Sequence, residues 1–162
     1  METVNWTVAV VSVDGYDART LLRDYFDELV ARYHDRPATR EEVSAAMADD
    51  PSDVLRHPTG RFLLARAGGR AAGCCALKMM EPGAAEVVRM YVRPRDRGRG
   101  GGAELLAAAE AHARHLGVRT LRLQVRSDLV EARRLYVAHG FEEVERFTDS
   151  PYADHCYAKA IG

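Results

Sequence analysis

Arginines and glycines crowd the segment 95–102, where their types and spacing could bind a phosphate group. The run reads Arg95-Asp-Arg97-Gly-Arg-Gly100-Gly-Gly102 and leads into an Ala/Leu-rich stretch. Glycines let backbone amides come close to a ligand, and the first turn of a following helix presents unpaired N–H groups and a partial positive charge. This combination predicts a loop that binds phosphate.

Other sites could use a similar loop. Gly98-x-Gly100-x-x-Ala103 formally matches a dinucleotide-binding fingerprint. That match is weak, because residues 94–97 separate the loop from the preceding strand and no acidic residue ends the next strand. A nucleoside-triphosphate loop needs Gly-Lys followed by Ser or Thr, which the segment lacks. An arginine-rich surface turn that only caps a helix is the remaining alternative.

A strand and a helix must position this loop. Residues 85–92 form an apolar run typical of a strand, and residues 102–115 carry apolar side chains at helical spacing before Gly117 ends the helix. Residues 120–126 alternate strictly between apolar and polar side chains, which predicts a strand. Residues 129–139 predict a further helix.

The rest of the chain supplies the other layers of a mixed α/β sandwich. Helices are expected at residues 17–33 and 39–48, and strands at residues 6–13, 61–67, 71–80, 143–148 and 155–161. Paired helices, consecutive strands and then a strand–helix–strand–helix–strand segment indicate an α/β (α+β) fold around one central sheet. Residues 1–162 contain no repeat or long linker, so we expect a single domain.

Composition narrows the classes of partner. The net charge is −1, with 23 Lys+Arg against 24 Asp+Glu, which gives no support to nucleic-acid or anionic-membrane binding. No apolar run approaches the length of a membrane span, and no signal-peptide pattern begins the chain. Cys74, Cys75 and Cys156 lack metal-site spacing and are typical of a reducing compartment, so we expect a cytoplasmic protein without a metal.

Three spaced motifs resemble the GNAT superfamily of acetyl-CoA-dependent N-acetyltransferases. Arg97-x-x-Gly100-x-Gly102 matches the family's Arg/Gln-x-x-Gly-x-Gly/Ala signature, residues 85–94 resemble the strand before it, and residues 132–141 resemble a later helix that carries Leu-Tyr and ends before Gly-Phe. The resemblance covers residues 85–144. It implies a mixed central sheet of about six to seven strands flanked by about four helices, which agrees with the expected order of elements.

The resemblance implies how acetyl-CoA would bind. The backbone of the strand end at Met90, Tyr91 and Val92 would pair with the pantetheine arm like a short extra strand. The amides of the following loop would bind the pyrophosphate, and its arginines could add charge-assisted contacts or reach the 3′-phosphate. The loop residues implied are Arg97, Gly98, Arg99, Gly100, Gly101, Gly102 and Ala103.

The resemblance also implies two catalytic residues. Tyr136 would act as the general acid that protonates the departing thiolate; its alternative role is a core aromatic side chain. Glu86 would act as the base that removes a proton from the amine. The alternative for Glu86 is a carboxylate on the sheet surface, paired with Arg89 or Arg122.

Some positions depart from the family pattern or stay open. Leu129 replaces an asparagine that often hydrogen-bonds the pantetheine, so Ser127, Asp128 or apolar packing would have to compensate. Gly101 replaces a branched apolar residue, which predicts a more flexible loop. His155 could contact the substrate or move a proton, whereas His112 is expected to face solvent.

The resulting hypothesis is transfer of an acetyl group to a primary amine by direct attack, without a nucleophilic role for Cys74 or Cys75. The alternative is a catalytically silent module that senses acyl-CoA. Polyamines, amino acids, aminoglycoside-like compounds and protein N-termini all remain open as acceptors, and a homodimer is possible. Acidic residues of the first half, such as Asp50, would suit an amine, although solvent-facing carboxylates are more common.

Overall fold

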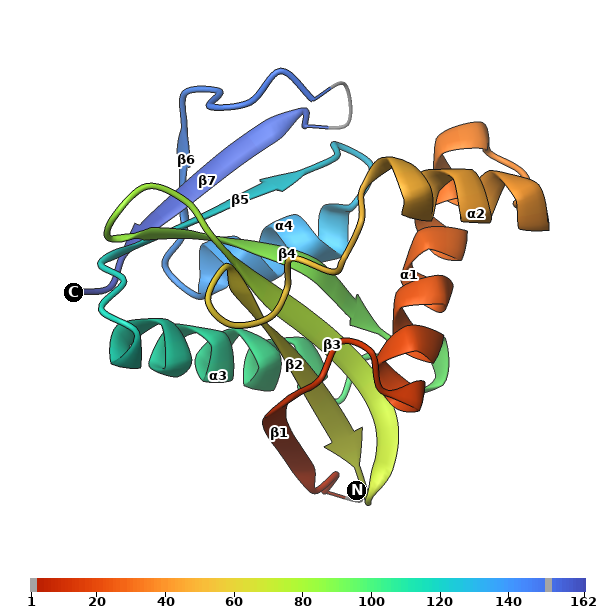
Figure 1. The fold of residues 1–162 in the computed structure, drawn as a ribbon, viewed down its shortest axis with the longest axis horizontal. Helices are drawn as coiled ribbons and strands as arrows, with labels where there is room; N and C mark the ends of the chain where they lie inside the picture. Colours follow the sequence, from red (N-terminus) through yellow and green to blue (C-terminus); the bar gives the residue numbers. More distant parts are fainter. Residues whose placement is uncertain (1–2, 151–152) are drawn as a thin grey trace.

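The computed structural model of the protein describes residues 3–150 and 153–162. Within these residues, four α-helices surround a seven-stranded sheet of order β1-β2-β3-β4-β5-β7-β6 (Figure 1). The strands are β1 (Trp6–Val11), β2 (Gly60–Ala67), β3 (Arg70–Met79), β4 (Ala84–Val92), β5 (Thr120–Val125), β6 (Glu142–Val144) and β7 (His155–Ala160). The helices are α1 (Tyr16–His34), α2 (Arg40–Asp49), α3 (Gly101–His115) and α4 (Val130–Ala138). The mixed sheet predicted from the sequence is confirmed.

The first part of the sheet, β1 to β4, is antiparallel. Gly68 and Gly69 form the turn between β2 and β3 and both have positive φ, 58° and 83°. A side chain would be strained in this conformation, so glycine is required there.

The sheet changes character between β4 and β5. These strands run parallel and pair where Ala84–Glu86 of β4 meets Thr120–Arg122 of β5. Beyond Glu86 the two strands diverge (Figure 1). In the second half of β4, the backbone edge that faces away from β3 therefore has no strand partner in β5.

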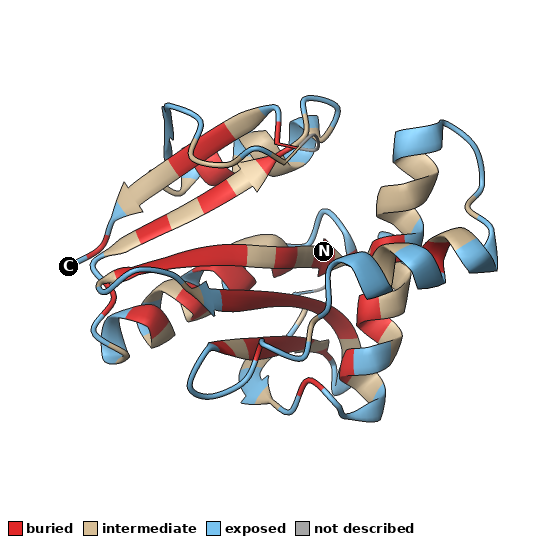
Figure 2. Cartoon of the chain, turned by 45° about the horizontal axis from the view of Figure 1, so that its top comes forward, coloured by how far each residue is buried: buried red, intermediate tan, exposed pale blue. Residues whose placement is uncertain are grey.

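Helices cover both faces of the sheet. On one face, α3 and α4 pack against alternate residues of the central strands, including Leu63, Cys75 and Leu121. On the other, α1 packs against Phe62, Leu64 and other alternate residues. The buried residues are accordingly concentrated in the central strands (Figure 2). Strand alternation thus directs successive side chains into two different cores.

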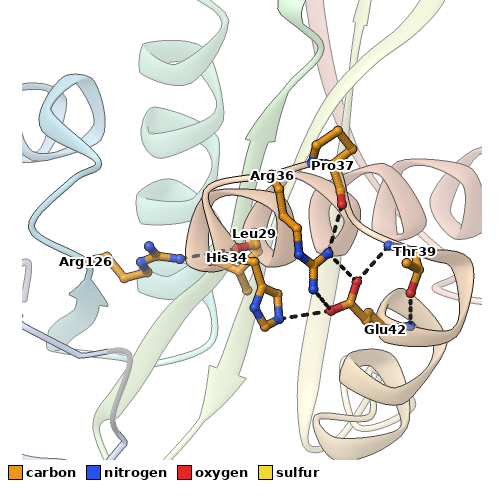
Figure 3. A network of polar contacts seen from close by, with 7 residues as sticks. All are labelled: Leu29, His34, Arg36, Pro37, Thr39, Glu42 and Arg126. Carbon is orange, nitrogen blue, oxygen red and sulfur yellow. Dashed lines mark hydrogen bonds and ion pairs between the residues drawn. The ribbon is translucent and has the colours of Figure 1, made fainter.

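The corner between α1 and α2 is fixed by polar contacts. Thr39 accepts a hydrogen bond from the Glu42 backbone, and the Glu42 carboxylate accepts one from the Thr39 backbone, which completes a capping box. The same carboxylate binds Arg36 and His34 (Figure 3). Hydrogen bonds from Arg36 and Thr39 lower the pKa of Glu42. Glu42 therefore has a structural role at this corner.

The sequence prediction was wrong at several points. The strand expected at residues 143–148 is only Glu142–Val144, because the Arg146 guanidinium binds the carbonyls of Thr148, Ser150 and Ala153 and draws the chain into a loop. The first strand ends at Val11 rather than residue 13.

His112 on α3 was expected to face solvent, but its Nε2 is buried and has no hydrogen-bond partner in the described part of the chain. Burial lowers the pKa of His112, and the charges of Arg61 and His115 lower it further. A neutral imidazole is therefore favoured at this position.

Candidate active site

A cavity of about 760 Å³ opens where β4 and β5 diverge. The loop before α3, the end of β4, the first turns of α4 and one face of α1 form its walls. Of the residues singled out from the sequence, the cavity contacts Glu86, Tyr136, Met90, Tyr91, Val92, Arg97, Gly98, Gly100, Gly101, Gly102 and Ala103. Arg99 is not among its lining residues. The fold thus brings nearly all of the candidate residues to one space.

The loop that enters this cavity is shaped by its backbone. Gly98 and Gly100 have φ values of 75° and 87°, which residues other than glycine rarely adopt. Gly100 lies directly before the first turn of α3, so the unpaired N–H groups of that turn are presented beside the cavity. The arrangement suits an anion such as pyrophosphate.

An ion pair between buried Asp96 and partly exposed Arg70 fixes the base of the loop. Asp96 is 1% exposed and lies in the 3-10 turn that precedes the glycines. Its two carboxylate oxygens accept hydrogen bonds of 2.8 and 2.9 Å from Arg70 at the start of β3. These bonds lower the pKa of Asp96 below its ordinary value. The loop is thereby tied to the sheet.

Trp6 of β1 packs against the start of α3. A Cβ added to Gly101 would lie 2.6 Å from the Trp6 ring, and the Trp6 Nε1 donates a 2.9 Å hydrogen bond to the Arg99 carbonyl. The indole therefore occupies the space that a branched side chain at position 101 would need. The greater flexibility expected from Gly101 is opposed by this contact.

The Arg97 side chain forms its hydrogen bonds with other residues of the protein. Its Nε donates a 2.8 Å hydrogen bond to the Val92 carbonyl, another nitrogen donates to Glu28 Oε1 at 2.8 Å, and the guanidinium lies 5.6 Å from the centre of the Tyr91 ring. These contacts connect the loop to the end of β4 and to α1. In this structure the side chain therefore organises the loop, whereas the backbone is left to contact a ligand.

A bulge in β4 adjoins the cavity. The pairing of β3 with β4 shifts between Cys74 and Ala76, and Arg89 there has a φ of 57°. The Arg89 guanidinium is buried, donates to the Asp50 carboxylate at 2.9 Å and lies 5.0 Å from the Phe26 ring centre. The bulge and the segment after α2 are thus joined by one side chain. Asp50 lines the cavity, although the pairing with Arg89 neutralises it.

Glu86 lies where the pairing of β4 with β5 ends, and it is 7% exposed. Gln124 of β5 donates a 2.7 Å hydrogen bond to Glu86 Oε2. The suggested pairing with Arg89 or Arg122 was wrong, because those arginines bind Asp50 and Glu81 instead. The second carboxylate oxygen of Glu86 has no hydrogen-bond partner in residues 3–150 and 153–162. A buried carboxylate with one free oxygen in a cavity can accept a proton.

Tyr136 of α4 approaches the cavity from the other face of the sheet. It is 5% exposed, and its ring contacts Phe141 edge-on with centroids 6.0 Å apart. The described residues provide no hydrogen-bond partner for its hydroxyl. Burial raises the pKa of Tyr136, with smaller contributions from Tyr25 and Cys75, so the phenol stays protonated at neutral pH.

Tyr25 was missed as a site residue. Tyr25 is one of the apolar residues that recur at helical spacing in residues 17–33, and by that pattern alone it is indistinguishable from a core aromatic. In the structure Tyr25 lines the cavity. Burial raises the pKa of Tyr25, and the nearby carboxylates Asp50 and Glu86 raise it further, whereas the positive charge of Arg89 opposes this increase. A second phenol therefore faces the same space as Glu86.

The other candidate residues lie at the rim or have other partners. Leu129 lines the cavity, whereas Asp128 binds Arg126 and the Ser127 hydroxyl contacts His155 Nε2 at 3.1 Å. The suggested replacements for an asparagine at position 129 are therefore engaged elsewhere, and the wall there is apolar. His155 also contacts Glu143 at 2.9 Å. The neighbouring residues 151 and 152 lie outside the described residues.

Among the described residues that line the cavity there is no cysteine and no group of metal-binding side chains. Cys74 and Cys75 are fully buried, and burial raises the pKa of Cys75 to about 12 and that of Cys74 further. Such thiols are poor nucleophiles because the thiolate is disfavoured. Within residues 3–150 and 153–162, no group of His, Cys, Asp or Glu side chains could bind a metal ion, and no helix is long and apolar enough to cross a membrane.

Comparison with known proteins places this geometry in context. The model of the Acetyltransferase (GNAT) family matches residues 18–141. An uncharacterised N-acetyltransferase of Schizosaccharomyces pombe is 29% identical over 163 residues, which cover 98% of this chain and 96% of that protein. An acetyltransferase of the GNAT family from Staphylococcus aureus has a TM-score of 0.78 at 14% identity, covering 98% of this chain and 100% of that one. The PaiA N-acetyltransferase of Thermoplasma acidophilum, solved in complex with coenzyme A, has a TM-score of 0.73 at 20% identity, covering 96% of this chain and 99% of that one.

Proposed function

Because the chain belongs to the GNAT acetyltransferase family and is thus an acyltransferase, we propose that it transfers an acetyl group from acetyl-CoA to a primary amine. The amine attacks the thioester directly. The observation that carries this proposal is the cavity at the divergence of β4 and β5, which Glu86 and Tyr136 enter from opposite faces of the sheet.

Acetyl-CoA, the donor, makes its main contacts with the backbone of the protein. The amides of residues 97–103 bind the pyrophosphate at the start of α3. The backbone of residues 90–92, which lacks a partner in β5, pairs with the pantetheine arm as an added strand would. Leu129, Ala132 and Leu135 line the opposite wall with apolar surface, which replaces the missing asparagine contact. The coenzyme A complex of the PaiA enzyme supports this choice of donor.

Glu86 and Tyr136 carry out two of the proton transfers that the reaction needs. Glu86 takes a proton from the acceptor ammonium, directly or through water, which frees the nitrogen lone pair for attack on the thioester carbon. The new C–N bond forms and the C–S bond breaks, and Tyr136 gives its phenol proton to the departing sulfur. The nitrogen loses its extra proton to water, and water returns a proton to the Tyr136 phenolate. A backbone N–H near residues 90–92 stabilises the negative charge on the carbonyl oxygen. The raised pKa of Tyr136 keeps the required proton in place.

No covalent enzyme intermediate is required. The thiols near the cavity, Cys74 and Cys75, are buried and have raised pKa values, which supports direct attack by the amine. Replacing both with alanine should leave acetyl transfer in place while the protein remains folded.

Release of free coenzyme A thiol with a panel of amines tests the proposal. Tyr136→Phe should lower kcat by about 10²-fold, as expected for loss of a general acid, without changing acetyl-CoA affinity measured by calorimetry. Tyr16→Phe is the matched control, because Tyr16 is 83% exposed and lies outside the cavity, and it should retain full activity.

Different outcomes separate the alternatives. Stabilisation by acetyl-CoA in a thermal-shift assay without turnover of any amine would identify a silent acyl-CoA sensor instead. Failure of acetyl-CoA to bind at all would contradict both functions.

A further inference from the structure

The part of the cavity beyond Glu86 is formed by side chains from separate elements, and we call it the acceptor end. It consists of Tyr25, Leu29 and Arg32 of α1, Val54 of the segment after α2, Lys78 of β3, Glu86 of β4 and Arg126, which directly follows β5. These side chains lie on the same side of the sheet as α1, since Glu86 and Gln124 alternate with residues that face α3 and α4. Their charges decide which amine can bind.

Most cations around the cavity are already paired. Arg89 binds Asp50, and Arg97 binds Glu28. Arg126 binds Asp128 and donates a 3.2 Å hydrogen bond to the Leu29 carbonyl of α1 (Figure 3). These charges therefore stabilise the walls and have little attraction left for a ligand.

Two cations are different. Within residues 3–150 and 153–162, the side chains of Arg32 and Lys78 have neither a hydrogen bond nor an ion pair, although both line the cavity. Arg32 is half-buried and lies one helical turn beyond Glu28. Lys78 is exposed and stands opposite Glu86 in the β3–β4 register, yet no ion pair joins them. The acceptor end thus carries uncompensated positive charge beside the carboxylate that must receive an ammonium group.

We propose that the acceptor is an amine that also carries a carboxylate, as an amino acid does, with Arg32 binding that carboxylate and Lys78 adding charge. This inference rests on the proposed acetyl transfer and names its substrate class. A polyamine or an aminoglycoside would bring additional positive charges towards Arg32 and Lys78, and like charges repel. An amino acid instead offers its ammonium group to Glu86 and its carboxylate to a guanidinium, which can bind both oxygens.

The remaining surface of the acceptor end favours an apolar body on this substrate. Tyr25, Leu29 and Val54 line the cavity on the side of α1 and of the segment after α2. Among the described residues, Glu131 on the first turn of α4 is a further anion of the lining without an ion pair. It is exposed, so solvent screens its charge as it screens that of Lys78, and half-buried Arg32 provides the main attraction for a carboxylate. An α-amino acid with an apolar side chain therefore fits the charges and the walls together.

Matched acceptors test the proposal. Thiol release is measured with leucine, methionine and phenylalanine, their carboxamides, their decarboxylated amines, and spermidine, and kcat/KM is expressed per unprotonated amine. The free acids should exceed the carboxamides by about tenfold or more. Arg32→Gln should lower kcat/KM for the acids by about 10- to 100-fold with little effect on the carboxamides, and Lys78→Gln should do so to a smaller extent.

Two further variants make the result specific. Arg32→Lys keeps the charge and should recover part of the preference for acids, which a merely structural role of Arg32 does not predict. Arg19→Gln removes an exposed cation of the same helix outside the cavity and should leave the preference intact.

A preference for spermidine or for the decarboxylated amines would overturn the inference, as would an equal loss for acids and carboxamides in Arg32→Gln. Acetylation of amines without any preference for a carboxylate would overturn this inference alone. Absence of thiol release with every amine would overturn the proposed transfer as well.

Discussion

The two ends of the cavity are built in different ways. At the donor end, one continuous stretch from the end of β4 to the start of α3 supplies backbone amides, and its Arg97 and Asp96 side chains bind other parts of the protein. At the acceptor end, side chains from α1, β3, β4 and the segment after β5 meet, and some of their charges have no partner in the described structure.

The difference follows from what each end has to bind. A pyrophosphate is the same in every reaction of the donor, and glycines beside a helix start suffice to bind it. An acceptor varies between enzymes, so its site depends on individual side chains that can change without affecting the loop. Changes at one end should therefore leave binding at the other end intact.

The largest effect is expected from Glu86→Gln at the acceptor end. Loss of the base should lower kcat/KM for the amine by about 10²- to 10⁴-fold, whereas the Gln124 contact can be kept by an amide oxygen. Thiol release measures the first quantity and calorimetry measures acetyl-CoA affinity, which should stay unchanged. Weaker acetyl-CoA binding in this variant would mean that the two ends are not separable.

Asp96→Asn tests the donor end through stability. Its carboxylate loses charge-assisted bonds to the partly exposed Arg70, so the free energy of unfolding should fall by about 2 kcal/mol near pH 7. For a chain of this length the melting temperature should fall by about 4–8 °C.

The pH dependence of this effect has a definite sign. Arg70 lowers the pKa of Asp96, so the stabilisation is fully present above the ordinary pKa of 3.8 and is lost as the pH falls through the folded value. Melting curves of the wild type and Asp96→Asn should therefore converge under strongly acidic conditions. A difference that does not change with pH would show that the charge of Asp96 is unimportant.

The smallest effect is expected from Gly101→Val. The new side chain would collide with the Trp6 ring and displace the first turn of α3, so the dissociation constant for acetyl-CoA should rise by about tenfold. The KM for the amine should change little. Adding Trp6→Ala removes the obstacle and should restore part of the affinity; if it does not, the Trp6 contact is not what restricts position 101.

Much of the fold could be predicted because it depends on local patterns. Alternation in residues 120–126 and helical spacing in residues 102–115 give the correct elements, and Gly117 ends the α3 segment as expected. The strand predicted to extend to residue 148 was wrong because its end depends on the contacts of Arg146 with residues up to Ala153.

The candidate site likewise has one part that local sequence patterns predict and another that depends on the packing of distant elements. The glycine loop is continuous in sequence, so its motif was recognisable, and the structure places it at the cavity. Tyr25 and Arg32 belong to a helix about 60 residues away from Glu86, and only the packing of α1 on the sheet brings them near it. One signal was available for Gln124: alternation with Leu123 and Val125 puts it on the opposite face of β5, where Glu86 also lies.

The contact of Trp6 with the start of α3 also gives the molecule an internal optical probe. Trp6 is the single tryptophan of the chain, and its indole lies against Gly101 and donates to the Arg99 carbonyl. Its fluorescence therefore originates beside the backbone amides that we propose to bind the donor. Emission from an unlabelled sample would report occupancy of the donor end by itself, and could be followed during turnover while the acceptor is varied.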